Sequence, residues 1–165
     1  MAKIVTAIDE DNTPETISIN TRLFLAGGIT NCPDWQAELI DKIKNIPHLT
    51  VYNPRRPVFE AGNETYGVPQ ISWEYKHLGE ADVIVFWFAK GSVNPIVLYE
   101  LGKYGNSSET PIIIGMDPEY LRKDDVRIQT LLARPDITVH ESFDSFSEAI
   151  LKFLYSRTSN RTKKK

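Results

Sequence analysis

Cysteine is almost absent from this chain of 165 residues, which has one cysteine, Cys32, and three histidines, His48, His77 and His140. A single cysteine cannot form an internal disulfide or a cysteine-based metal cluster, and the histidines lack the spacing of metal ligands. We therefore expect no structural metal, and a reducing compartment, the cytoplasm.

Long apolar runs and a surplus of basic charge are lacking as well. No run approaches the roughly 18 residues of a membrane span, and the N-terminal stretch turns acidic too early for a secretory signal. The formal net charge of -3 offers no basic excess to attract nucleic-acid phosphates. Membranes and nucleic acids are therefore not expected as partners.

What the sequence does contain is a regular alternation of apolar runs and amphipathic helical segments. Such β-α alternation is typical of an α/β fold, a doubly wound parallel sheet with helices on both faces. The sequence predicts a sheet of five parallel strands, at residues 22–26, 49–52, 82–88, 111–115 and 137–139.

The two ends of the chain lie outside this alternation. Two short β-prone runs at residues 4–8 and 16–19, separated by a polar turn, predict an N-terminal accessory hairpin. Residues 1–157 are expected to form one domain, and the lysine-rich residues 158–165 a disordered tail.

The topology predicts where a ligand binds. In an open parallel sheet, ligands bind beyond the carboxyl ends of the strands, where the strand order reverses. With the common order 2-1-3-4-5, this point lies between the strands ending at Ala26 and Phe88. Gly27 and Gly28 would let a ligand approach the backbone there, although a Gly-Gly turn also simply ends strands. We expect this turn and the loop at residues 89–94 to face each other.

The most informative residue is Glu100, in a helix predicted over residues 95–104 that is apolar almost all round. Catalytic carboxyls cluster in buried settings, whereas an ordinary helical Glu faces solvent. Glu74 lies early in a helix predicted from residue 70 and can approach the same crevice, a solvated position being its alternative. Two carboxyls can displace a group from a sugar with retention, one as nucleophile and the other as acid.

Other side chains near this point are candidates for binding a substrate. Trp73, Trp87 and Phe88 can stack on a nucleobase, and the alternative is a place in the core. Arg55 and Arg56 lie in a long loop rich in Pro and Gly and can cover the base or take a phosphate, the alternative being a solvated loop pair.

The residues that carry these expectations resemble those of the nucleoside 2-deoxyribosyltransferases. The resemblance rests on Phe-Leu-Ala-Gly-Gly at 24–28, Asp-Val-Ile-Val at 82–85, and Asn94 followed by Tyr-Glu-Leu-Gly at 99–102. It extends over about residues 22–115. The resemblance implies a flavodoxin-like fold and a ping-pong exchange of 2-deoxyribosyl groups between free nucleobases without a cofactor. It also implies deoxynucleosides as substrates and a homo-oligomer.

Individual roles follow from the resemblance by position. Glu100 matches the family's nucleophile, and Glu74 matches an acidic residue that contacts the base and helps to protonate it. Asn94 matches a position, commonly Asp, that holds the 5′-hydroxyl of the sugar. The Asn-Pro-Arg-Arg run at 53–56 together with Trp73 and Glu74 suggests a branch of shorter, divergent members.

The sequence departs from the family's pattern at two points. Phe24 stands where the family has a tyrosine beside the nucleophile, so another group, such as Tyr99 or Tyr75, would have to orient Glu100. The C-terminal Asn that a neighbouring subunit contributes in better-known members has no clear match.

Two other functions are compatible with the same residues. A nucleoside 5′-monophosphate N-glycosidase would use water to intercept the glycosyl-enzyme, but the turn after Ala26 lacks the serine and arginine residues expected around a phosphate. A non-catalytic nucleoside-binding module is the second alternative, because one fold hosts many functions. A buried Glu100 argues against it, since a binding pocket gains little from a carboxylate beside the sugar.

Overall fold

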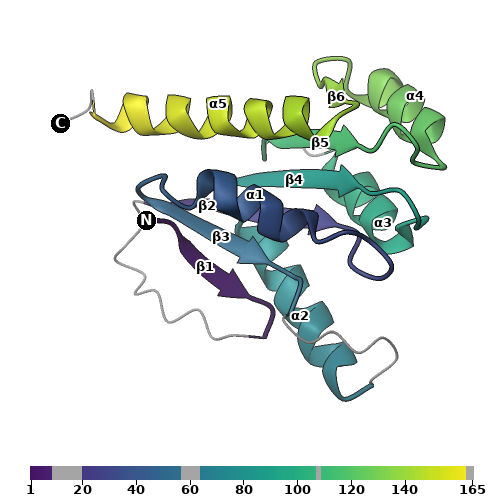
Figure 1. Ribbon diagram of the computed structural model, residues 1–165, viewed down its shortest axis with the longest axis horizontal. Coiled ribbons are helices and arrows are strands. Elements are labelled where there is room, and N and C mark those ends of the chain that lie inside the picture. Colours follow the sequence, from purple (N-terminus) through teal and green to yellow (C-terminus); the bar gives the residue numbers. More distant parts are fainter. Residues whose placement is uncertain (9–19, 57–63, 107–108, 163–165) are drawn as a thin grey trace.

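The computed structural model describes residues 1–8, 20–56, 64–106 and 109–162. These residues form six strands and five helices, shown in Figure 1. The strands are β1 (Lys3–Thr6), β2 (Thr21–Gly27), β3 (Leu49–Asn53), β4 (Val83–Phe88), β5 (Ile112–Met116) and β6 (Val139–His140). The helices are α1 (Trp35–Ile43), α2 (Glu64–Glu80), α3 (Pro95–Tyr104), α4 (Lys123–Ala133) and α5 (Phe143–Thr162).

All six strands are parallel and belong to one sheet, in the order β1-β3-β2-β4-β5-β6. The α/β class and the parallel sheet are therefore confirmed, and the last five strands follow the predicted 2-1-3-4-5 order. The order reverses between β2 and β4, which pair with Ala26 opposite Phe86. The predicted site thus lies at the carboxyl ends of these two strands.

The prediction of five strands was wrong, because the first β-prone run belongs to the sheet. It forms β1 at the edge and pairs in parallel with β3, with Ile4 opposite Val51. Val5 is buried in the core of the domain, so apolar burial holds this strand on the sheet. The run at 16–19 lies outside the described residues, and the predicted hairpin is not confirmed.

Two helices extend beyond their predicted bounds. Helix α2, predicted from residue 70, begins at Glu64, and Pro69 lies inside it. Helix α5 continues to Thr162, into the segment predicted to be a disordered tail. Residues 143–162 contain neither Gly nor Pro, so no residue in this stretch ends the helix.

The helices cover the two faces of the sheet in separate groups. Apolar residues of α1 and α5, including Leu39 and Ile150, pack on one face, whereas residues of α2, α3 and α4, including Val97 and Val126, pack on the other. Side chains of a strand alternate between the faces. Neighbouring residues of β4 therefore enter different halves of the core, which decides where the predicted aromatic residues lie.

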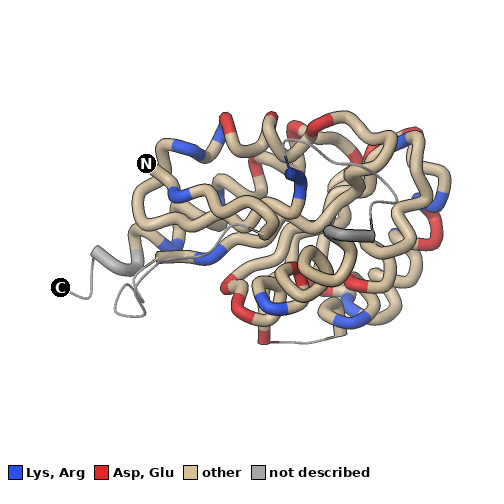
Figure 2. The backbone as a smooth tube through the Cα atoms, turned by 90° about the horizontal axis from the view of Figure 1, so that it is seen from below, with Lys and Arg blue, Asp and Glu red and all other residues tan. Residues whose placement is uncertain are grey.

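The surface carries charges of both signs. Figure 2 shows Lys and Arg interspersed with Asp and Glu along the described backbone. Within the described residues, no helix combines the length and apolar character needed to cross a membrane. The absence of a nucleic-acid partner and the cytoplasmic location stay predictions.

Candidate active site

Glu100 is a buried carboxyl on α3, with 9% of its surface exposed. It lies three residues after the buried Val97, on the inward side of the helix, whereas Ile96 and Tyr99 face outward. Burial raises the pKa of Glu100 to about 8, the nearby charge of Glu74 adds to this rise, and Lys103 opposes it. The predicted burial of Glu100 is confirmed.

Glu74 approaches the same place from α2. It is half-buried, and burial raises the pKa of its carboxyl, while a hydrogen bond from Gln70 and the charge of Arg56 oppose the rise. Because the charge of Glu74 raises the pKa of Glu100, the two carboxyls lie within electrostatic reach of each other. The structure thus brings together the two residues that the sequence selected as catalytic candidates.

The two carboxyls titrate as a pair. The charge of Glu74 contributes to the raised pKa of Glu100, so Glu74 loses its proton first and Glu100 keeps its own up to about pH 8. Between these two steps the pair holds one proton. Nucleophilic attack with acid assistance uses the form of this singly protonated pair in which the proton has moved to Glu74 and Glu100 is the carboxylate.

Gly27 and Gly28, predicted to let a ligand approach the backbone, leave room for other parts of the protein, and the approach of a ligand stays a prediction. A Cβ atom on Gly27 would lie 2.3 Å from the ring of Trp35, and one on Gly28 would lie 2.1 Å from Oδ1 of Asn94. The indole Nε1 of Trp35 donates a hydrogen bond of 3.2 Å to the carbonyl of Gly28. The absence of these two side chains therefore allows close packing at the strand ends.

Asn94 joins the two loops at the switch point. Its side chain is buried, and Nδ2 donates to the carbonyls of Ala89 at 3.2 Å and Ser92 at 3.3 Å. Its Oδ1 lies 3.6 Å from Sγ of Cys32, in the opposite loop. The predicted facing of the two loops is confirmed. A contact between Asn94 and the sugar stays a prediction, since these protein contacts already engage both ends of the amide.

The three candidate stacking residues lie in different parts of the core. Trp73 packs against Phe24, with ring centres 6.1 Å apart, on the face of the sheet that α3 covers. Trp87 packs on the opposite face, beneath α1 and α5. Phe88 is fully buried against Tyr120, with ring centres 5.2 Å apart. Of the three, only Trp73 combines the correct face with a place on the helix that carries Glu74, and base stacking stays a prediction.

Arg55 has a position that the sequence did not predict. Its guanidinium is engaged by the loop between β2 and α1, and its side chain is only 17% exposed. The Nη2 atom donates to three carbonyls and the Nε atom donates to one side chain, the partners being Ile29, Cys32, Pro33 and Gln36, at 3.0–3.3 Å. The carboxylate of Asp34 lies 3.4 Å away. Arg55 thus holds this loop in place, and a contact with substrate stays a prediction.

A family model described as nucleoside 2-deoxyribosyltransferase like matches residues 20–120, well over half of the chain. The chain belongs to this family. The matched segment runs from the start of β2 to Tyr120 and contains both Glu74 and Glu100. Among curated proteins, none matches the chain. Membership in the family supports nucleosides or nucleobases as substrates, and homo-oligomerisation stays a prediction.

Gln70, which the sequence did not indicate, and Arg56, which was predicted to cover the base or take a phosphate, lie next to the carboxyl pair of this family member. Gln70 donates a hydrogen bond of 2.9 Å to Glu74, and Arg56 donates one of 2.9 Å to Gln70. The spacing of four residues between Gln70 and Glu74 was the available signal. Tyr75 and Tyr99, considered as groups to orient Glu100, are 68% and 70% exposed on the outer sides of their helices.

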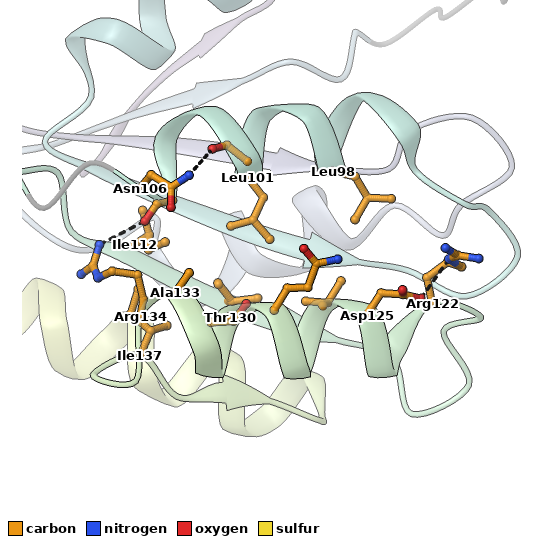
Figure 3. Close-up of a pocket in the computed structure, with 15 residues that line it drawn as sticks. Leu98, Leu101, Asn106, Ile112, Arg122, Asp125, Thr130, Ala133, Arg134 and Ile137 are labelled. Carbon is orange, nitrogen blue, oxygen red and sulfur yellow. Dashed lines mark hydrogen bonds and ion pairs between the residues drawn. The ribbon is translucent and has the colours of Figure 1, made fainter.

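A cavity of about 310 Å³ lies between α3 and α4, and Figure 3 shows the side chains around it. Leu98 and Leu101 of α3 line it, whereas none of the predicted site residues does. In the described part of the chain, no three His, Cys, Asp or Glu residues are grouped so that they could hold a metal ion.

Proposed function

We propose that the protein transfers a 2-deoxyribosyl group between nucleobases, with Glu100 as the nucleophile and Glu74 as the acid and base. The observation that carries the proposal is the buried carboxyl pair within the segment that matches the family. Removing a carboxylate from water costs free energy, and buried carboxyls with shifted pKa values cluster at functional sites.

The proposed reaction has two balanced halves. The first starts from the singly protonated pair with its proton on Glu74: a carboxylate oxygen of Glu100 forms a bond to C1′ of the deoxynucleoside, the bond from C1′ to the base breaks, and Glu74 gives its proton to the leaving base. In the second, a nitrogen of another base attacks C1′, the ester to Glu100 breaks, and Glu74 takes the proton of the incoming base. The two displacements retain the configuration at C1′. No cofactor is needed for these steps.

A base-exchange experiment tests this function. The pure protein is incubated with 2′-deoxyinosine, with and without adenine, and the products are separated by chromatography. We expect deoxyadenosine to form only when adenine is present, because the glycosyl-enzyme needs an acceptor base. Release of hypoxanthine without exchange would instead show a hydrolase. No reaction with a panel of deoxynucleosides and their 5′-monophosphates would favour a binding module.

The pH dependence of exchange is expected to be bell-shaped. Below the raised pKa of Glu74 both carboxyls are protonated and no nucleophile is present, whereas above about pH 8 both are ionised and no acid is left. Glu74→Gln removes the acid and also the charge that raises the pKa of Glu100. We expect this variant to lose roughly 10²-fold or more in rate and to lose the decline above about pH 8.

Initial rates measured between about pH 5 and about pH 9 test this expectation, with Glu38→Gln as the control. Glu38 is an exposed carboxyl on α1 and undergoes the same change of carboxyl to amide. A Glu74→Gln profile with the same shape as that of the unsubstituted protein would rule out Glu74 as the acid.

A further inference from the structure

Gln70 is a buried amide, 8% exposed, that connects Glu74 to Arg56. Its Nε2 donates to Oε1 of Glu74 at 2.9 Å and to the carbonyl of Pro54 at 3.2 Å. Its Oε1 accepts a hydrogen bond of 2.9 Å from Nε of Arg56. Both ends of the amide are therefore engaged inside the protein.

These partners permit only one orientation of the Gln70 amide. A guanidinium can only donate, so the amide oxygen must face Arg56. A carbonyl oxygen can only accept, so the amide nitrogen must face Pro54 and, with its second hydrogen, Glu74. Turning the amide over would place donors against Arg56 and an oxygen against the oxygens of Pro54 and Glu74. Arg56 thus fixes which atom of Gln70 meets the catalytic carboxyl.

This orientation has a consequence for the two oxygens of Glu74. Oε1 accepts a hydrogen bond from a group that carries no acceptor on that side, so a proton on Oε1 would find no acceptor there and would weaken this bond, because a hydroxyl oxygen accepts less strongly than a carbonyl oxygen. When Glu74 is protonated, the proton is therefore favoured on Oε2, the oxygen that Gln70 does not bind.

We propose that Arg56 and Gln70 position Glu74 for proton transfer, by keeping its proton on Oε2 and stabilising the carboxylate that remains when the proton leaves. The inference rests on the proposed function. In the first half-reaction the proton passes from Oε2 to the leaving base, and the bond from Gln70 to Oε1 becomes charge-assisted and stronger. This hydrogen bond therefore stabilises the transition state more than the ground state, which is the condition for a contribution to rate. Arg56 and Gln70 are positioning residues that act through Glu74.

The hydrogen bonds from Arg56 to Gln70 and from Gln70 to Glu74 form a relay. This relay also explains a role for the Asn-Pro-Arg-Arg run at residues 53–56. Arg55 clamps the loop that follows β2, whereas Arg56 orients Gln70, and the carbonyl of Pro54 accepts from the same amide. Consecutive residues after β3 thus bind both the loop that follows β2 and helix α2.

The test compares Gln70→Met with the unsubstituted protein. Met has a similar length and no donor, so Glu74 loses the hydrogen bond that opposes the rise in its pKa. Carbon-13 NMR of protein labelled at the glutamate carboxyls follows the titration, with Glu74→Gln to assign the signal. We expect the midpoint of Glu74 to move to higher pH and the acidic limb of the rate profile to move with it. We also expect kcat to fall roughly tenfold with KM nearly unchanged.

Two further variants examine the far end of the relay and guard against a folding defect. Arg56→Met removes the group that orients the amide and should move the Glu74 midpoint in the same direction, whereas Arg56→Lys retains a donor and should restore it in part. Gln36→Met is the matched control, because Gln36 is also buried and also accepts from an arginine Nε, that of Arg55, at 3.0 Å. It should leave the midpoint of Glu74 in place.

The outcomes separate this inference from the proposed function. If Gln70→Met and Arg56→Met leave both the Glu74 midpoint and the acidic limb unchanged, the relay is overturned even when base exchange is observed. If the midpoint moves but the protein exchanges no bases, the contact is real and its catalytic role is refuted. A moved midpoint with a moved acidic limb supports the proposal.

Discussion

Glu100→Gln is expected to lower the rate of base exchange by more than a factor of about 10³, the scale on which removal of a covalent nucleophile acts. The amide keeps the shape of the side chain but cannot form the ester with C1′. Exchange of deoxyinosine with adenine, followed by chromatography, measures this loss. A variant that keeps most of its activity would show that another group attacks the sugar.

The same substitution is expected to increase thermal stability at about pH 8. The pKa of Glu100 rises from an ordinary value of 4.5 to about 8 in the folded protein, so folding favours the neutral form. As the pH rises from about 4.5 to about 8, the unfolded chain releases this proton while the folded chain retains it, and the protein loses stability. Gln does not ionise, so the variant escapes this loss.

The gain in stability has an upper bound of roughly 5 kcal/mol, which rearrangement around the carboxyl reduces to about 2 kcal/mol. For a chain of this size, we expect Tm to rise by about 4–8 °C near pH 8 and hardly at all near pH 4. Calorimetry at both pH values measures the difference, with Glu38→Gln as the exposed control. If the variant and the unsubstituted protein have the same Tm at about pH 8, folding does not raise the pKa of Glu100.

The carboxyl at position 100 could be found from the sequence because two local signals agree there. The predicted bounds of α3 match the structure, and Pro95 at its start and the apolar residues around Glu100 indicate a helix packed on a sheet. A charged residue in such a helix is conspicuous. The β-α alternation indicated a doubly wound sheet, and the order 2-1-3-4-5 that is common in such sheets is the order of the last five strands.

The positions of β1, Arg55 and Trp87 depend on contacts between distant parts of the chain and could not be predicted in this way. β1 pairs with a strand more than 40 residues away, so its place on the sheet depends on which edge is available. The clamp at Arg55 depends on the direction of carbonyls in another loop. The face that Trp87 enters is set by the register of β4 and not by its type of side chain.

Gly27→Ala is expected to destabilise the protein by about 3 kcal/mol, because the added methyl group has no space. A Cβ atom there would lie 2.3 Å from the ring of Trp35 and 2.8 Å from the backbone oxygen of Trp87. Trp35 is only 2% exposed, packs against Phe146, and is held by its hydrogen bond to Gly28. Neither the ring nor the paired strand can withdraw without loss of other contacts.

The measurement is Tm by calorimetry, with a decrease of about 6–12 °C expected for a domain of this size. Gly102→Ala is the matched control, because Gly102 lies in α3 and, apart from its chain neighbours and the nearby backbone of its own helix, no atom lies within 4 Å of the added methyl group. Alanine is favoured over glycine in a helix by up to about 1 kcal/mol, so this variant should melt at the same temperature or higher. If Gly27 were needed for ligand approach instead, its Ala variant would keep its Tm and show a raised KM. Loss of stability would identify packing between β2, β4 and α1 as the reason for glycine at the end of β2.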